Sequence, residues 1–179
     1  YNMPVFQRNY VWGKDSIDRF LEDLEDIDLT KERDRHFLGP VIVTQKKAGG
    51  AARYTENWVI DGQQRLTTAY LTLAALAALG VDHEDFFRDV LSYLFHATTS
   101  NRLRPLLVTG ADDSSQLREA FSRLPEEVFG RIDMSHRPGN KEGKLFDAFS
   151  RILGRFKKQI KAEADSMKEG DIPEGTDPR

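Results

Sequence analysis

The stretch VIDGQQRLTTAYLTL, residues 59–73, changes character twice. An apolar run ends at Asp61, the polar residues Gly62 to Arg65 follow, and then a long apolar pattern with helical spacing begins. A glycine at such a junction lets the backbone turn tightly and lets a ligand approach the main chain. The first turn of a helix also presents unpaired amide groups and the positive end of the helix dipole. We therefore expect a strand, a tight turn and a central buried helix from about Gln64 to Leu79, whose start could receive an anion.

The side chains at this junction have the chemistry to bind phosphate. Arg65 offers a planar guanidinium that matches phosphate oxygens in pairs. Gln63 and Gln64 add neutral donors and acceptors, and Thr67 and Thr68 supply hydroxyl groups one turn later. These residues are the first candidates for a phosphate-binding site.

Asp61 is the only carboxylate of the junction. It could hold Mg²⁺ or orient a water if a triphosphate were bound there. The plainer alternative is that Asp61 and Gly62 form a tight turn while Arg65 makes a surface ion pair, and spacing alone favours that alternative. The sequence contains no P-loop motif.

A second polar segment, FQRNYVW, occupies residues 6–12. Pro4 argues against helix, so we expect an extended chain with Gln7 and Asn9 on one face and Arg8 and Tyr10 on the other. An arginine among aromatic rings can stack on a base or pair with a phosphate.

The alternative for this segment is an edge strand in which Phe6, Tyr10 and Trp12 fill the core and Arg8 faces water. If Arg8 and Arg65 instead line one cleft, an anionic ligand is its natural occupant. Both interpretations stay open at the level of sequence.

The rest of the first 80 residues alternates helix and strand signals. Apolar residues at helical spacing predict a helix from Asp15, as the N-cap, to about Leu29. Residues 36–45 and 53–60 predict two strands of a hairpin joined by the turn 46–52, with Gly39-Pro40 as a kink or edge device in the first strand.

The pattern after Gly80, which we expect to stop the central helix, is mostly helical. Helices are predicted around 86–95, 117–124 and 145–160, and Asp113 or Ser114 could cap the second of them. Residues 102–108 predict a short extended piece. The chain is therefore expected to be mixed α/β first and all-helical later.

Composition excludes several classes of function. The net charge is −3, so no overall positive field attracts nucleic acid, and the absence of cysteine excludes disulfides and cysteine-based zinc sites. The longest apolar run, 69–79, is too short to span a bilayer, and we see no signal peptide. We expect a cytoplasmic protein with no membrane contact. The histidines show no metal-ligand spacing; they are His36, His83, His96 and His136.

The segment MPVFQRNYVW, residues 3–12, followed by VIDGQQRLTTAYLTLAAL, residues 59–76, resembles the N-terminal domain of GmrSD-type, modification-dependent DNA restriction enzymes. The resemblance extends over nearly all of the chain except its tail. It implies an α+β fold of the ParB/sulfiredoxin-like superfamily. The implied parts are a small mixed sheet with helices over 1–80, an all-α subdomain over 81–164 and a disordered linker over 165–179. Because the chain opens at Tyr1 inside a motif, we expect a fragment whose nuclease domain, of HNH type in relatives, lies elsewhere.

The resemblance also implies activity. The Asp-Gly-Gln-Gln-Arg motif of the family is associated with binding and hydrolysis of nucleoside triphosphates, in the manner of a GTPase or general NTPase. By motif match, the catalytic residues are Asp61, Gln64 and Arg65, with Mg²⁺ on Asp61. The phosphate-binding residues by the same match are Gln7, Arg8, Gly62, Gln63, Arg65, Thr67 and Thr68.

Some relatives sense modified DNA, with glucosylated bases or a sulfur-modified backbone. Contact with modified DNA would fall on Gln7, Arg8, Tyr10 and Trp12. The expected function is thus an NTP-hydrolysing sensor domain in anti-phage restriction, acting with DNA and a nuclease partner. A basic face on the last helix, made of Arg155, Lys157, Lys158 and Lys161, is the better local patch for DNA. The alternatives are a non-catalytic module that binds modified DNA and a structural domain that docks a partner.

Overall fold

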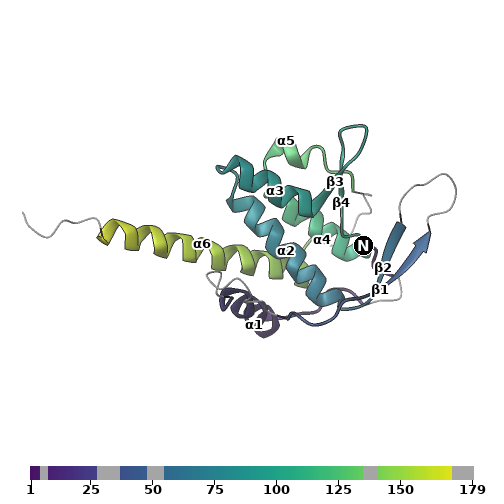
Figure 1. Ribbon diagram of the computed structural model, residues 1–179, viewed down its shortest axis with the longest axis horizontal. Coiled ribbons are helices and arrows are strands. Elements are labelled where there is room, and N and C mark those ends of the chain that lie inside the picture. Colours follow the sequence, from purple (N-terminus) through teal and green to yellow (C-terminus); the bar gives the residue numbers. More distant parts are fainter. Residues whose placement is uncertain (5–7, 28–36, 48–54, 135–140, 171–179) are drawn as a thin grey trace, which may run out of the picture.

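The computed structural model describes residues 1–4, 8–27, 37–47, 55–134 and 141–170 (Figure 1). The helix that begins after Gly62, α2 (Gln63–Leu79), lies at the centre and packs against α6 (Lys144–Gly170) and α3 (Glu84–Leu94). Its buried residues lie on all sides of the helix, as the apolar pattern predicts.

Two buried threonines of α2 form hydrogen bonds within the helix. The hydroxyl of Thr68 donates to the Gln64 carbonyl at 2.8 Å, and that of Thr72 donates to the Thr68 carbonyl at 2.9 Å. The helix ends at Gly80, where a Cβ would lie 2.5 Å from the Phe86 ring, so the absence of a side chain lets α3 fold back closely.

The first helix, α1 (Lys14–Glu25), packs on α6 through Ile17, Phe20 and Leu21. Its N-cap is Gly13 and no side chain caps it, so the prediction that Asp15 is the cap is wrong. Asp15 lies inside the first turn, where its charge favours the helix dipole.

Two arginines of α6 form ion pairs with carboxylates of α1. Arg151 donates to both carboxylate oxygens of Asp18 at 2.7 and 2.6 Å, and Arg155 donates to Glu25 at 2.9 and 2.5 Å. The hydrogen bonds from these guanidinium groups lower the pKa of each carboxyl. Arg155 is therefore engaged within the protein, which leaves lysines, such as the exposed Lys157 and Lys158, on the expected basic face.

The predicted hairpin is confirmed as the antiparallel pair β1 (Ile42–Lys47) and β2 (Thr55–Asp61), with Val43 opposite Val59. The N-terminal chain adds to its edge, because Asn2 lies parallel to Trp58 on one side and to Val108 on the other.

The part after residue 80 is not all-helical, because the strands β3 (Phe95–Ala97) and β4 (Leu103–Pro105) form a second antiparallel pair. The strand β4 lies in the piece 102–108 that the sequence predicts to be extended, and β3 lies at the end of the stretch 86–95 that it predicts to be helical. Strands of this length are too short to show a period of two. The remaining helices are α4 (Ala111–Phe121) and α5 (Glu126–Phe129). The α+β class is confirmed, and the parts expected as separate subdomains share one core that includes Tyr10, Leu71 and Phe149.

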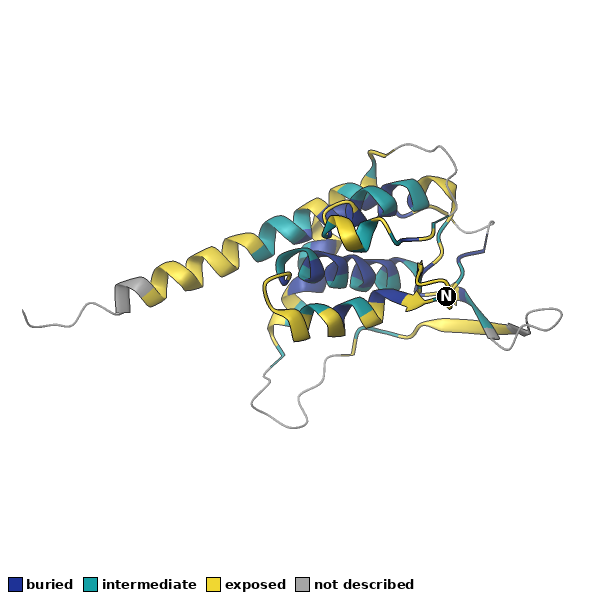
Figure 2. Cartoon of the chain, turned by 90° about the horizontal axis from the view of Figure 1, so that it is seen from above, coloured by how far each residue is buried: buried dark blue, intermediate teal, exposed yellow. Residues whose placement is uncertain are grey.

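The last turns of α6 extend away from the rest of the molecule, and their side chains are exposed up to Met167 (Figure 2). The helix continues to Gly170, inside the stretch 165–179 that was expected to be a linker; residues 171–179 lie outside the described residues. No helix in the described ranges is both long and apolar enough to cross a bilayer.

Candidate functional site

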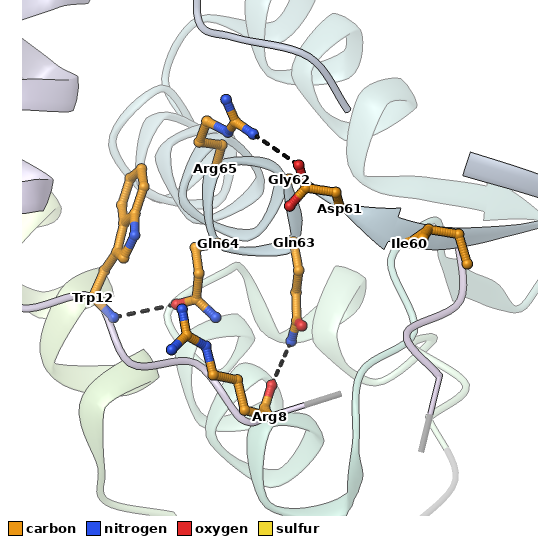
Figure 3. Close-up of a pocket in the computed structure, with 8 residues that line it drawn as sticks. All are labelled: Arg8, Trp12, Ile60, Asp61, Gly62, Gln63, Gln64 and Arg65. Atoms are coloured by element: carbon orange, nitrogen blue, oxygen red, sulfur yellow. Dashed lines mark hydrogen bonds and ion pairs between the residues drawn. The ribbon is translucent and has the colours of Figure 1, made fainter. Parts of the chain in front are cut away.

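The two polar segments singled out in the sequence meet at one pocket, with a volume of about 340 Å³. Figure 3 shows its lining side chains from residues 8–12, the end of β2 and the start of α2. The lining residues are Arg8, Trp12, Ile60, Asp61, Gly62, Gln63, Gln64 and Arg65. Most of the predicted site therefore lies on one surface.

Gly62 makes the turn between β2 and α2 with φ at 87°, in the left-handed region that glycine adopts readily. A Cβ on Gly62 would lie 2.9 Å from the Pro40 carbonyl oxygen and 3.0 Å from Val41. The glycine is therefore required both by its backbone angle and by the close passage of residues 40–41. No side chain in the described part of the chain caps α2, so its first amides can receive water or a ligand at the pocket.

Arg65 lies on one side of this pocket. Its Nη2 is 3.8 Å from the Asp61 carboxylate, and its Nη1 donates to the Leu38 carbonyl at 3.4 Å. Both contacts are long, and 64% of the Asp61 side chain is exposed. The guanidinium thus keeps donor capacity for an anion.

Gln64 holds residues 9–12 against α2. Its Oε1 accepts the amides of Val11 at 2.8 Å and Trp12 at 3.2 Å, and its Nε2 donates to the Asn9 carbonyl at 3.4 Å. Gln64 is buried, with 9% of the residue exposed, and its amide bonds the backbone of the neighbouring segment. Its geometry is that of a support for the pocket wall.

Arg8 is exposed and lies on the other side of the start of α2 from Arg65 (Figure 3). Its carbonyl accepts a hydrogen bond from Gln63 Nε2 at 2.8 Å, which fixes the backbone and leaves the guanidinium over the pocket. The two arginines therefore line one pocket from two directions.

Three of the predicted site residues are buried and do not line the pocket. Thr67 and Thr68 face the core of the molecule, because α2 is buried nearly all round. The Tyr10 hydroxyl bonds Thr68 Oγ1 at 2.8 Å, and burial raises the pKa of Tyr10 to about 12. Arg8 and Tyr10, expected on the same face of an extended segment, lie in different surroundings, since Arg8 is exposed and Tyr10 is buried, as in the alternative interpretation of this segment. Gln7 and Phe6 lie outside the described residues.

Sequence reasoning missed two residues that shape the site. Asp113, read as a possible helix cap, is buried in α4 and accepts the Tyr10 amide at 2.8 Å. Burial raises the pKa of this carboxyl. Gly39, read as a kink, lies against the Arg65 guanidinium. The Gly39-Pro40 pair indicated an unusual backbone in the sequence, but it did not indicate that the Arg65 side chain would lie against Gly39.

A second, wider pocket of about 730 Å³ adjoins the first and shares Trp12 and Arg65 with it. Acidic side chains of α1, Asp15 and Glu22 among them, line its far part. Within the described residues, no group of three histidine, cysteine or acidic side chains could hold a metal ion. His83 and His96 are exposed, and His36 and His136 lie outside the described residues.

A comparison with protein families gives an independent assignment. The family model described as GmrSD restriction endonuclease, N-terminal domain, matches residues 1–172, which is nearly the whole chain. No curated protein matches the chain. The resemblance carried by the two polar segments is thereby confirmed, and the chain belongs to the family of GmrSD restriction endonuclease N-terminal domains, a part of the restriction enzymes that act in defence.

Proposed function

We propose that the pocket binds a nucleoside triphosphate, hydrolyses it and thereby regulates DNA cutting by the nuclease part of the restriction enzyme. The observation that carries the proposal is the convergence of residues 8–12 and 61–65 on one pocket. That pocket combines two arginines with an uncapped helix start. Its volume of about 340 Å³ suits the phosphate chain of a nucleotide.

The charges of the lining residues favour a bound cation beside the nucleotide. Arg8 and Arg65 supply two positive charges, and Asp61 supplies one negative charge. A triphosphate carries several negative charges and would be repelled by Asp61 alone. Mg²⁺ is commonly held by one or two carboxylates together with phosphate oxygens and waters, so the exposed Asp61 fits as its protein ligand. The ion would neutralise phosphate charge there.

The chemistry assigned to the chain is positioning and electrostatic stabilisation. A water attacks the terminal phosphorus, a new phosphorus–oxygen bond forms, and the bond to the bridging oxygen breaks, giving a nucleoside diphosphate and inorganic phosphate, while the proton of the water is released to solvent. Arg65 and Arg8 would neutralise the charge on the phosphoryl oxygens, and the α2 amides would orient the phosphate chain. Asp61 would alternatively orient the water. Gln64 contributes by holding the wall that carries Arg8 and Trp12.

The test is phosphate release from each of the four nucleoside triphosphates with Mg²⁺, with and without modified DNA. We expect Arg65→Ala and Arg8→Ala to lower the rate by about 100-fold or more, as removal of a charge-stabilising donor does. The matched control is Arg88→Ala, which removes an exposed arginine paired with Glu84 four residues earlier on α3, away from the pocket. Rates that fall equally in the control and in the two pocket variants would contradict the proposal.

A second candidate function is non-catalytic binding of modified DNA. It is favoured by Arg8 and Trp12, because an exposed guanidinium and a partly buried indole line the pocket together and can receive a phosphate and a base. This candidate predicts salt-dependent DNA affinity that falls in Arg8→Ala, with no phosphate release from any nucleotide. Tyr10 takes no part in it, since its ring is buried.

A further inference from the structure

The Arg65 guanidinium lies directly against the bare Cα of Gly39. A Cβ built on Gly39 would lie 1.8 Å from Arg65 Nη1 and 3.0 Å from Cζ. Gly39 also has φ at +88°, where side chains are rarely found. Residue 39 can therefore carry no side chain while Arg65 holds its observed position.

The hydrogen bonds of Arg65 do not by themselves fix that position. Its contacts with Leu38 and Asp61, at 3.4 and 3.8 Å, are at the weak end of the usual range. The chain at residues 40–41 lies close against the start of α2, because a Cβ on Gly62 would come within about 3 Å of Pro40 and Val41. The space left by Gly39 thus decides where the guanidinium lies.

We propose that Gly39 is a positioning residue for Arg65: its missing side chain keeps the guanidinium at the edge of the nucleotide pocket. The inference rests on the proposed function. Because the colliding atoms are the far end of a long side chain, a methyl group at residue 39 displaces Arg65 rather than the backbone around it. The variant Gly39→Ala is then expected to lose the contribution of the Arg65 guanidinium to hydrolysis, as Arg65→Ala does.

A double-mutant cycle between Gly39→Ala and Arg65→Ala tests the proposal. We expect Gly39→Ala to lower kcat by about 100-fold, as misplacement of a positioned group does. In the Arg65→Ala background the same change should lower kcat no further. If the two losses multiply instead, Gly39 does not act through Arg65 and the proposal is overturned.

Thermal unfolding supplies a readout that does not depend on hydrolysis. The backbone strain of alanine at residue 39 is common to both backgrounds and cancels in the cycle. Displacing Arg65 breaks its contacts with Leu38 and Asp61, which are already absent in the Arg65→Ala background, so the fall in Tm should be smaller in that background. Equal falls in both backgrounds would overturn the proposal.

Gly13→Ala is the control, because no atom lies within 4 Å of its added Cβ, and it should leave kcat unchanged.

The two proposals can fail separately. If the wild type releases no phosphate from any nucleotide, the proposed hydrolysis is wrong, and the Tm cycle still decides whether Gly39 positions Arg65. If the wild type hydrolyses nucleotide and the cycle is additive in both kcat and Tm, hydrolysis stands and the role of Gly39 is refuted.

Discussion

Replacing Gln64 by leucine tests how the pocket is held together. Leucine has a similar size but no acceptor, so the amides of Val11 and Trp12 would lose the oxygen that they now share. The Asn9 carbonyl would lose its donor as well. Residues 9–12 would then be free to leave α2.

The cost follows from the number of donors left without a partner. An unsatisfied buried donor costs about 1–3 kcal/mol, and both amides belong to partly buried residues that water can reach in part. We therefore expect Gln64→Leu to lower the free energy of unfolding by about 2–4 kcal/mol. Such a loss is a large part of the stability of a typical domain.

Gln63→Leu is the matched control, since the neighbouring Gln63 donates an exposed hydrogen bond to the Arg8 carbonyl. Its expected cost is about 0.5–1 kcal/mol. Urea unfolding followed by circular dichroism gives both values, with equal slopes if the unfolded states are alike. A loss in Gln64→Leu no larger than that in Gln63→Leu would refute the role given to Gln64.

Three further changes test the helices. Gly154→Ala, in the interior of α6 with no atom within 4 Å of the added Cβ, should raise the free energy of unfolding by about 0.5–1 kcal/mol, and a lower Tm would contradict the assigned helix. Burial raises the pKa of Asp113, so its carboxyl contributes to stability in acid and this contribution is lost as the pH rises through that pKa. The variant Asp113→Asn should therefore have a higher free energy of unfolding than the wild type at neutral pH. In unfolding experiments at acid pH, the two proteins should be equally stable. The hydrogen bond from Arg151 lowers the pKa of Asp18, so this carboxylate stabilises the fold at neutral pH and loses that effect as the pH falls through its pKa. Asp18→Asn should therefore lower the free energy of unfolding by about 0.5–1 kcal/mol at neutral pH and have no effect below that pKa. A cost that does not change with pH would count against the pair with Arg151.

Long periodic elements could be predicted from the sequence. The central helix differs from its prediction by one residue at its start, because a continuous apolar pattern bounded by Gly62 and Gly80 leaves few alternatives. The hairpin was also predictable, since its strands carry β-branched and aromatic residues on either side of a glycine-rich turn.

The site could be predicted in part. Arg8, Asp61 and Arg65 line one pocket as expected. Thr67 and Thr68 do not line the pocket, because α2 is buried on nearly all sides and both threonines lie in the core. The Thr68 hydroxyl bonds the Gln64 carbonyl and the Tyr10 hydroxyl instead.

The residues that sequence reasoning missed act through long-range contacts. Asp113 looks like a helix cap in the sequence, and only the folded chain brings the Tyr10 amide to its carboxylate. Gly39 looks like a local kink in the sequence, and the side chain that lies against it, Arg65, belongs to another element, α2. Tertiary contacts of this kind leave no periodic signal.

The most direct test of the central claim is a crystal structure of the protein with Mg²⁺ and a non-hydrolysable nucleoside triphosphate. The account predicts electron density for the phosphate chain at the start of α2, with Arg8 and Arg65 in contact with phosphate oxygens. Density at another surface, or none at millimolar nucleotide, would contradict it.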